Sequence, residues 1–383
     1  MCIRDSDLTY QYPKDAGGKI LNNRLRYVQD PVPDNYYAED INSQTGLNRT
    51  QVLAERLPEQ ATDNYIYDKI GNLIKDKKED ITKIEWTVYG KISKITKNDA
   101  ASTTIEYEYD ASGNRIYKKV TTSGAGAATK YTFYVRDASG NTMAVYTRTD
   151  LAAVLWSEQH LYGSSRLGMY LPNMAVPASA PIPPAGTGLA DGMELGKVSY
   201  ELSNHLGNVL VTVSDKKIQI QNGSTGTVLY HTADVQTATD YYPFGMVMPG
   251  RKYEPQSGYR YGFNGKEKDK DMNSLTAYDY GFRIYNPGIG KFLSVDPLMS
   301  GYPMLTPYQF SSNRPIDGID LDGLEYYTIH MHEIGKSKGK SIFIVFKEDH
   351  TNMTEAQIQA AHKMSARDFY IRFSKTFEAE AEE

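Results

Sequence analysis

The chain has 383 residues, with 42 Lys and Arg against 47 Asp and Glu and a formal net charge of −5. This length suits one large domain or two to three ordinary ones, while the acidic balance argues against a broad nucleic-acid-binding face. The single cysteine, Cys2, excludes an internal disulfide, and no run approaches the roughly 18 apolar residues of a membrane span. The 31 Tyr against 11 Phe and 2 Trp favour an all-β protein, because tyrosine suits a half-buried strand.

The first 60 residues carry little pattern. Residues 1–6, MCIRDS, lack the apolar stretch of a signal peptide and do not match the pattern of the later residues. We therefore expect that the chain begins in the middle of a longer protein and that these six residues are an artefact of where the sequence was cut. Residues 7–60 are polar, and their tyrosines lie among several prolines. We predict that residues 1–60 form an irregular N-terminal segment of the repeat region.

A short turn unit, Asp-x-x-Gly-Asn or a close variant, recurs without a fixed period over residues 61–240. Apolar residues alternate with polar ones before the turn and again after it, which is the period of strands with one buried face. The aspartate can accept hydrogen bonds from turn amides, and glycine tolerates a positive φ. The pattern therefore predicts repeated β-hairpins, whose turn residues are Asp68, Gly71, Asp110, Gly113, Asp137, Gly140 and Gly207.

One stretch within this region, residues 171–193, breaks the alternation. It contains five prolines, and proline cannot occupy a central strand because it has no N–H to donate. We expect an exposed loop or insertion here.

Several longer motifs lie after residue 240: DYYPFG, GFNGKEKD, YDYGFRIYNPGIGKFLSVDPL and NRPIDGIDLDGLE. Together with the repeated turn units and NHLGNVLVTVSD, they resemble the Rhs/YD-repeat proteins, and residues 241–324 resemble the Rhs repeat-associated core domain. The resemblance implies a mainly β fold: a fragment of a repetitive β-hairpin shell with a core plug, followed by a small α+β segment at residues 325–383. This chain has too few repeats to close a full shell.

The resemblance also implies a function. Such a chain would be the C-terminal end of a bacterial polymorphic toxin or delivery protein that encloses its own variable C-terminal segment and releases it by intramolecular aspartyl autoproteolysis. Its partners would be that segment and cell-surface or secretion-system components, and it would be secreted or displayed on the cell surface. No cofactor is implied. The alternative is a structural or adhesive cell-surface repeat protein that binds a partner or glycan without being cut.

Two aspartates, Asp296 and Asp320, resemble the catalytic pair of the family, and the scissile bond would join Leu324 to Glu325. Two carboxylates in close contact cannot both ionise, so one can hold a proton while the other activates water. The reaction would be a single turnover, because the bond is already held in place. The chain has no motif for an enzyme that acts on an external substrate.

One departure weakens this assignment: Leu321 stands where the family usually has proline, so the backbone before the bond is less constrained. Asp317 and Asp322 could compete for the catalytic role. All these aspartates also fit ordinary turns, since Asp-Pro and Asp-Gly are common turn formers. Asp317, Asp320 and Asp322 together suggest a calcium loop, but the remaining positions of that motif do not match.

The last segment, residues 325–383, predicts a small strand-plus-helix unit. Ile342–Phe346 reads as a buried strand, and apolar residues at helical spacing follow a capping box that begins at Thr354. His330 and His332 look metal-like, but strand alternation places them on one face without a metal. No activity can be assigned to this segment from its residues.

Overall fold

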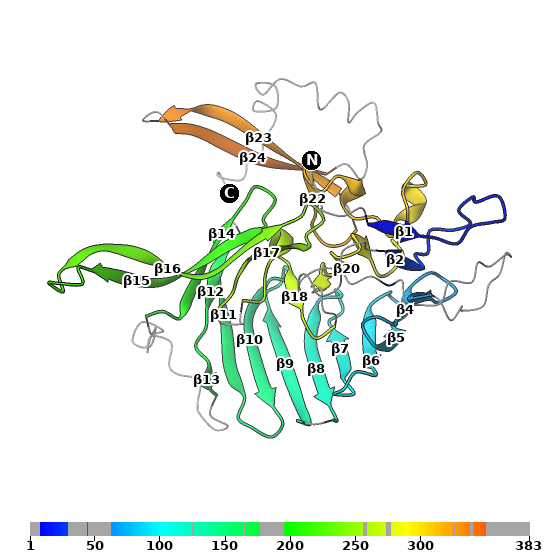
Figure 1. Ribbon diagram of the computed structural model, residues 1–383, viewed down its shortest axis with the longest axis horizontal. Coiled ribbons are helices and arrows are strands. Elements are labelled where there is room, and N and C mark those ends of the chain that lie inside the picture. The colour runs from blue at the N-terminus through cyan, green and yellow to red at the C-terminus, as the bar shows by residue number, and fades with distance from the viewer. Residues whose placement is uncertain are drawn as a thin grey trace.

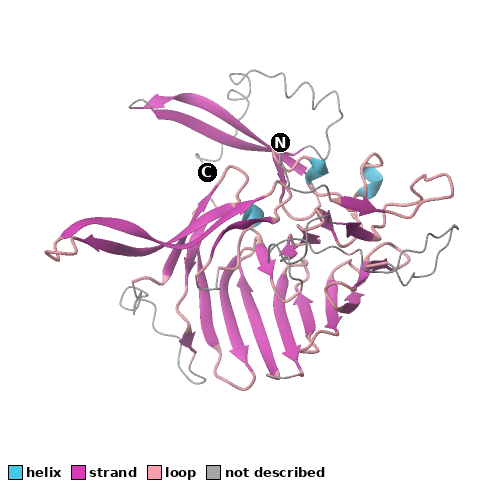
Figure 2. Cartoon of the chain, viewed as in Figure 1, coloured by secondary structure: helices cyan, strands magenta, loops and turns pink. Residues whose placement is uncertain are grey.

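The computed structural model describes most of the chain up to Leu324 and the backbone of one hairpin beyond it. The described residues are 8–29, 44, 63–124, 126–163, 165–176, 195–255, 259–272 and 277–324, with the backbone alone at 326–337 and 340–349. Strands dominate this part, and it contains 3₁₀ turns but no α-helix (Figure 2). No helix in these ranges has the length and apolar character needed to cross a bilayer.

The dominant element is a 15-stranded antiparallel sheet in which nearly every strand pairs with its neighbour in sequence (Figure 1). The small strand β13 (Met174–Ala175) pairs with β11, off the main path. The remaining strands, in chain order, are β3 (Tyr65–Tyr67), β4 (Leu73–Asp76), β5 (Ile81–Trp86), β6 (Ile92–Lys97), β7 (Thr104–Tyr109), β8 (Arg115–Thr122), β9 (Ala128–Arg136), β10 (Thr142–Thr149), β11 (Leu155–Tyr162), β12 (Arg166–Tyr170), β14 (Val198–Ser203), β15 (Val209–Gln221), β16 (Val228–Tyr241) and β17 (Val247–Tyr253).

One hydrogen bond recurs in the Asp-x-x-Gly-Asn turns: the backbone N–H of the asparagine donates to Oδ1 of the aspartate four residues earlier. Asp68 Oδ1 accepts from the backbone N–H groups of Gly71 and Asn72 at 2.7 and 2.8 Å, and Asp137 Oδ1 accepts from those of Ser139 and Asn141. The glycine of each unit has a positive φ, which only glycine adopts without strain, at Gly71 (110°), Gly113 (83°), Gly140 (85°) and Gly207 (76°).

A second group of elements, the core region, consists of residues 259–324 and lies against one face of the large sheet (Figure 1). It contains two small antiparallel sheets, the second of which includes the hairpin beyond residue 324. Its elements are η2 (Phe263–Gly265), β18 (Glu267–Asp269), β19 (Ala277–Asp279), β20 (Ile284–Asn286), β21 (Lys291–Phe292), η3 (Met299–Gly301), η4 (Ser311–Asn313) and β22 (Gly318–Asp320), followed by β23 (Tyr326–Ser337) and β24 (Lys340–Asp349).

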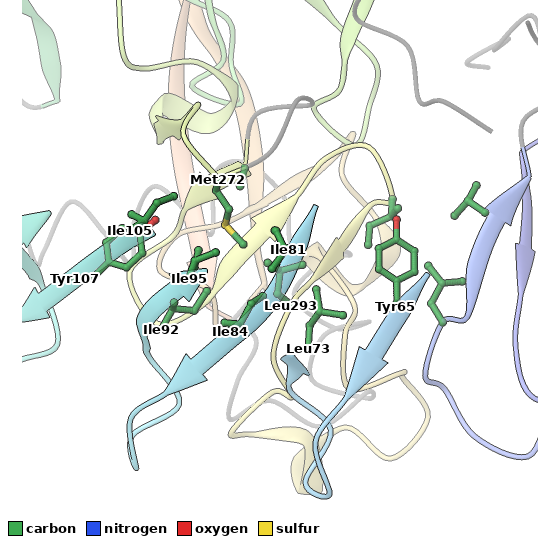
Figure 3. Packing of buried hydrophobic residues seen from close by; sticks show 14 residues of the cluster. Tyr65, Leu73, Ile81, Ile84, Ile92, Ile95, Ile105, Tyr107, Met272 and Leu293 are labelled. Atoms are coloured by element: carbon green, nitrogen blue, oxygen red, sulfur yellow. The ribbon is translucent and has the colours of Figure 1, made fainter. Parts of the chain in front are cut away.

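A shared apolar core joins the core region to the sheet. Isoleucines of β5, β6 and β7, including Ile84, Ile95 and Ile105, point toward Met272 and Leu293 of the core region (Figure 3). All of these side chains are at most 3% exposed. Because burial of one large apolar side chain stabilises a fold by about 1.5–3 kcal/mol, this contact fixes where the core region sits.

A second cluster inside the core region is aromatic. Tyr285 and Phe310 stack with ring centroids 4.2 Å apart, and the cluster as a whole consists of Phe263, Tyr278, Tyr280, Tyr285, Phe292 and Phe310. These rings hold β19, β20 and β21 in a fixed arrangement around the candidate site.

A buried network of charged side chains also joins the two parts. Arg115 of β8 lies 3.0 Å from carboxylate oxygens of both Glu267 and Asp269, and 3.3 Å from Asp279. Lys118, on the same strand, contacts Asp269 at 2.6 Å. Burial of single charges is costly unless they are paired, so this network fixes β18 and β19 relative to the sheet.

Several expectations can be compared with this architecture. The mainly β fold is confirmed, and the predicted strand Ile342–Phe346 lies within β24. The sheet continues to Tyr253 through β17, beyond the boundary expected at residue 240. Short strands β1 (Thr9–Gln11) and β2 (Tyr27–Gln29) pair within the N-terminal segment. The middle of the Pro-rich stretch, the helix expected after Thr354 and the side chains of His330 and His332 lie outside the described residues.

Candidate functional site

Three charged side chains from separate elements of the core region meet at the candidate site. Arg283 immediately precedes β20, Asp296 lies in the loop after β21, and Asp320 ends β22. Arg283 Nη2 is 3.0 Å from Asp296 Oδ2 and 3.9 Å from Asp320 Oδ2. All three residues are at most 3% exposed. The structure thus brings the two predicted aspartates to a single guanidinium nitrogen.

The environment of Asp320 favours its protonated form. Burial raises the pKa of Asp320 to about 7, and the nearby carboxylate of Asp322 adds to the rise, although Arg283 opposes it. Asp320 Oδ1 accepts a hydrogen bond of 2.6 Å from the Gly323 N–H. This carboxyl can therefore hold a proton near neutral pH while the adjoining turn fixes its position.

Asp296 is held differently. Its Oδ2 lies 3.0 Å from Arg283 Nη2, and its Oδ1 accepts a hydrogen bond of 2.8 Å from the Leu298 N–H. The Asp296 N–H donates to the Pro307 carbonyl at 2.9 Å. The Asp-Pro turn predicted from the sequence is therefore present, but its carboxylate also faces the buried arginine.

Arg283 connects this pair to the segment after Asp320. Burial lowers the pKa of Arg283, while Asp296 and Asp320 oppose that shift. The guanidinium lies over the Phe292 ring, 3.8 Å from its centroid, and its Nε donates a hydrogen bond to the Gly323 carbonyl. The pattern of the sequence did not identify Arg283, since only its contacts distinguish it from other arginines.

The proposed scissile bond lies where β22 turns into β23. These strands pair antiparallel, with Gly318 opposite Thr328 and Asp320 opposite Tyr326. Gly323 has a φ of +90°, and a Cβ there would come within 2.9 Å of the Arg283 backbone nitrogen. Leu324 N–H donates to Asp322 Oδ1 at 3.1 Å. Glu325 lies outside the described residues.

The two alternative aspartates occupy other environments. Asp317 is half exposed and pairs with Arg314. Asp322 faces a cavity of about 340 Å³ that also borders Lys91, Lys266 and Leu321. Within the described ranges, no three His, Cys, Asp or Glu side chains gather as a metal-binding group. Asp296 and Asp320, by contrast, are buried beside Arg283.

Comparison with known sequences finds relatives of two kinds. No protein-family model matches the chain. Salivary gland surface protein 1 of Aedes aegypti is 30% identical over 277 residues, which is 72% of this chain and 7% of that protein. Toxin subunit YenC1 of Yersinia entomophaga is 36% identical over 104 residues, or 27% of this chain and 10% of the subunit. Toxin subunit YenC2 of the same organism is 33% identical over 87 residues, or 22% of this chain and 8% of the subunit.

Solved structures give a distant likeness. The crystal structure of TcdB2-TccC3-Cdc42 is similar to the chain at a TM-score of 0.45 and 17% identity, over 83% of this chain and 17% of that one. The crystal structure of TcdB2-TccC3 has the same TM-score at 16% identity, with the same coverage. The chain thus spans a tenth or less of the matched curated proteins and 17% of these solved chains.

Proposed function

We propose that the chain is part of an Rhs/YD-repeat toxin-delivery protein and that its core region cuts the peptide bond after Leu324. The matches to two toxin subunits support this family, and the repeated hairpins support it independently. The observation that carries the cleavage is the buried Arg283 between Asp296 and Asp320, beside the segment that leads to the bond.

The two carboxyl groups would divide the work. Asp296, ion-paired with Arg283, acts as the base that takes a proton from water as the water oxygen attacks the Leu324 carbonyl carbon. Asp320, with a pKa of about 7, supplies its proton to the leaving nitrogen of Glu325. The products are a new C-terminal carboxyl at Leu324 and a new amine at Glu325. A buried carboxyl that keeps its proton near neutral pH can act as the acid in such chemistry, beside a second carboxyl that accepts a proton from water.

Because the bond to be cut belongs to the same chain, Asp296 and Asp320 need to lower the barrier less than they would for a separate substrate. The segment from Asp320 to Leu324 is already fixed by hydrogen bonds from Lys266, Phe282 and Arg283, so little orientational entropy remains to be lost in the reaction. Residues 325–383 would be the released cargo, and the longer protein would be secreted or displayed on the cell surface.

Intact mass measured after expression of the full chain tests this proposal. We expect two fragments, with a new N-terminus at Glu325, and a single uncut chain for Asp296→Asn and for Asp320→Asn. Asp317→Asn is the matched control, because Asp317 lies on the same segment but is half exposed, and it should be cut like the unmodified chain. An uncut unmodified chain, or cleavage that survives both substitutions, would overturn the proposal.

A second candidate is a structural or adhesive surface protein that is never cut. The match that covers 72% of the chain, to a protein named as a salivary gland surface protein, favours it. An uncut chain that nevertheless folds, and whose mass is unchanged on prolonged incubation, would support this alternative.

A further inference from the structure

The backbone that leads to the proposed scissile bond is held at three successive carbonyl groups. The Leu321 carbonyl accepts a hydrogen bond from Lys266 Nζ, the Asp322 carbonyl from the Phe282 N–H at 2.8 Å, and the Gly323 carbonyl from Arg283 Nε. Every one of these donors belongs to the core region. We call these three hydrogen bonds the carbonyl grip. Every residue has a backbone carbonyl, so the carbonyl grip can fix the position of the segment whatever its side chains are.

Lys266 is positioned in part by contacts with the repeat region. It comes directly after the tight turn η2, where its N–H donates to the Phe263 carbonyl and its carbonyl accepts from the Gly262 N–H, both at 3.0 Å. Asn264, within that turn, receives its own support from the repeat region: its N–H donates to Asn208 Oδ1 at 2.8 Å. The hairpin turn before β15 therefore helps to position Lys266 relative to the segment from Leu321 to Leu324.

The charge of Lys266 is balanced by its surroundings and not by a direct ion pair among the described residues. Burial lowers the pKa of the Lys266 ammonium, while Asp320, Asp279 and Asp322 oppose the shift. The ammonium also lies 5.2 Å from the centroid of the Tyr280 ring. These groups keep the ammonium at the border of the cavity beside Leu321.

We propose that Lys266 is a positioning residue for the cleavage, and that its hydrogen bond to the Leu321 carbonyl holds the backbone at Leu321 in the orientation that the cut requires. This inference rests on the proposed self-cleavage. Proline would fix φ at residue 321 by its ring, whereas leucine leaves that torsion free. The lysine restrains the same peptide from outside, so the bond after Leu324 stays aligned with Asp296 and Asp320.

The experiment compares the rate and the accuracy of cleavage in the full chain, followed by mass spectrometry during cell-free synthesis. For Lys266→Met we expect cleavage to slow by roughly tenfold or more, as for other small misplacements of a reacting bond, and to yield more than one new N-terminus. Lys266→Arg should retain most of the rate. Adding Leu321→Pro to Lys266→Met should restore both rate and accuracy, because Asp320 is already extended, as a residue before proline must be.

Lys268→Met is the matched control. Lys268 is another lysine of the same motif whose pKa is lowered by burial to about 8, and its N–H pairs with the Arg260 carbonyl, away from the segment. We expect a single cut at the normal rate. Wild-type rate and accuracy in Lys266→Met, or no rescue by Leu321→Pro, would overturn the inference while leaving the proposed function intact.

Amide hydrogen exchange separates the two proposals if cleavage itself fails. In the Asp296→Asn background, Lys266→Met should accelerate exchange at Gly323 and Leu324 relative to Lys268→Met. The same measurement applies if the unmodified chain is never cut. Faster exchange at Gly323 and Leu324 in Lys266→Met would then support the hydrogen bond from Lys266 to the segment, and only the proposed cleavage would be refuted. Unchanged exchange at Gly323 and Leu324 in Lys266→Met would show that Lys266 does not hold the segment in place.

Discussion

At the scale of single residues, the two carboxyl groups of the candidate site lie at different distances from the same arginine. Asp296 has a direct ion pair with Arg283 at 3.0 Å, whereas Asp320 lies 3.9 Å from the same nitrogen and beside a second carboxylate, Asp322. One arginine therefore lies unequally close to the two carboxyl groups. Both carboxyls lie beside the same buried cation, which the sequence did not reveal.

The pH dependence of cleavage is set by this difference. The pKa of Asp320 is raised to about 7, so its proton is present below that pH and lost above it. We expect the first-order cleavage rate to fall by about tenfold for each pH unit above 7, measured by mass spectrometry from pH 6 to 9. A rate that is flat or rising across that range would assign the acid to another group.

Sequence reasoning located part of this site. Asp296 and Asp320 are recognisable because both lie in long, specific motifs. Arg283 was missed, because the neighbouring residues in the sequence do not show that its side chain is buried between two aspartates and the Phe292 ring. Lys266 was missed for the same reason, since its partner is a backbone carbonyl and not a side chain.

At the scale of elements, alternation and turn chemistry predicted most of the large sheet. The units at Asp68, Asp110 and Asp137 close hairpins in which the aspartate accepts turn N–H groups. One element that the pattern did not predict is β17, whose Pro249 and Gly250 argue against a strand. It forms because β17 ends the strand order of the sheet, where an absent N–H leaves no ladder partner unsatisfied.

The buried charges between β8 and the core region carry a prediction on stability. Arg115→Met would leave Glu267, Asp269 and Asp279 without their shared cation, and loss of one partner from a buried ion pair costs about 3–5 kcal/mol. We expect a loss of that order in the free energy of unfolding, from urea titration in the Asp296→Asn background.

The control for this experiment is an exposed pair in the sheet. Arg251 contacts Asp240 at 2.7 Å, but the two side chains are 66% and 45% exposed. Arg251→Met should therefore change the free energy of unfolding by less than about 1 kcal/mol. Equal effects of the two substitutions would show that the buried network adds nothing beyond surface charge.

At the scale of the whole molecule, the sheet and the core region share one apolar core and one charge network. Neither part buries these surfaces alone, so we expect them to unfold together. We therefore expect the large sheet and the core region to behave as one cooperative unit.

Spectroscopy can test this cooperativity without labels. Both tryptophans, Trp86 and Trp156, lie in the large sheet, on β5 and β11, whereas buried tyrosines lie both in that sheet and in the aromatic cluster of the core region, so their signal reports on both parts. Tryptophan fluorescence and near-ultraviolet circular dichroism of tyrosine should give the same urea midpoint in Asp296→Asn. Two separate midpoints would show that the core region unfolds independently.

The hairpin between β22 and β23 gives the proposed cut an unusual outcome. Since the bond lies in the turn that joins two paired strands, hydrolysis leaves a nicked hairpin whose strands are still side by side. The cut removes only the covalent tether, and with it the high effective concentration that the turn imposed on the pairing. Departure of the downstream piece then becomes a bimolecular equilibrium that dilution shifts, so cleavage and release are two events that the protein can time separately.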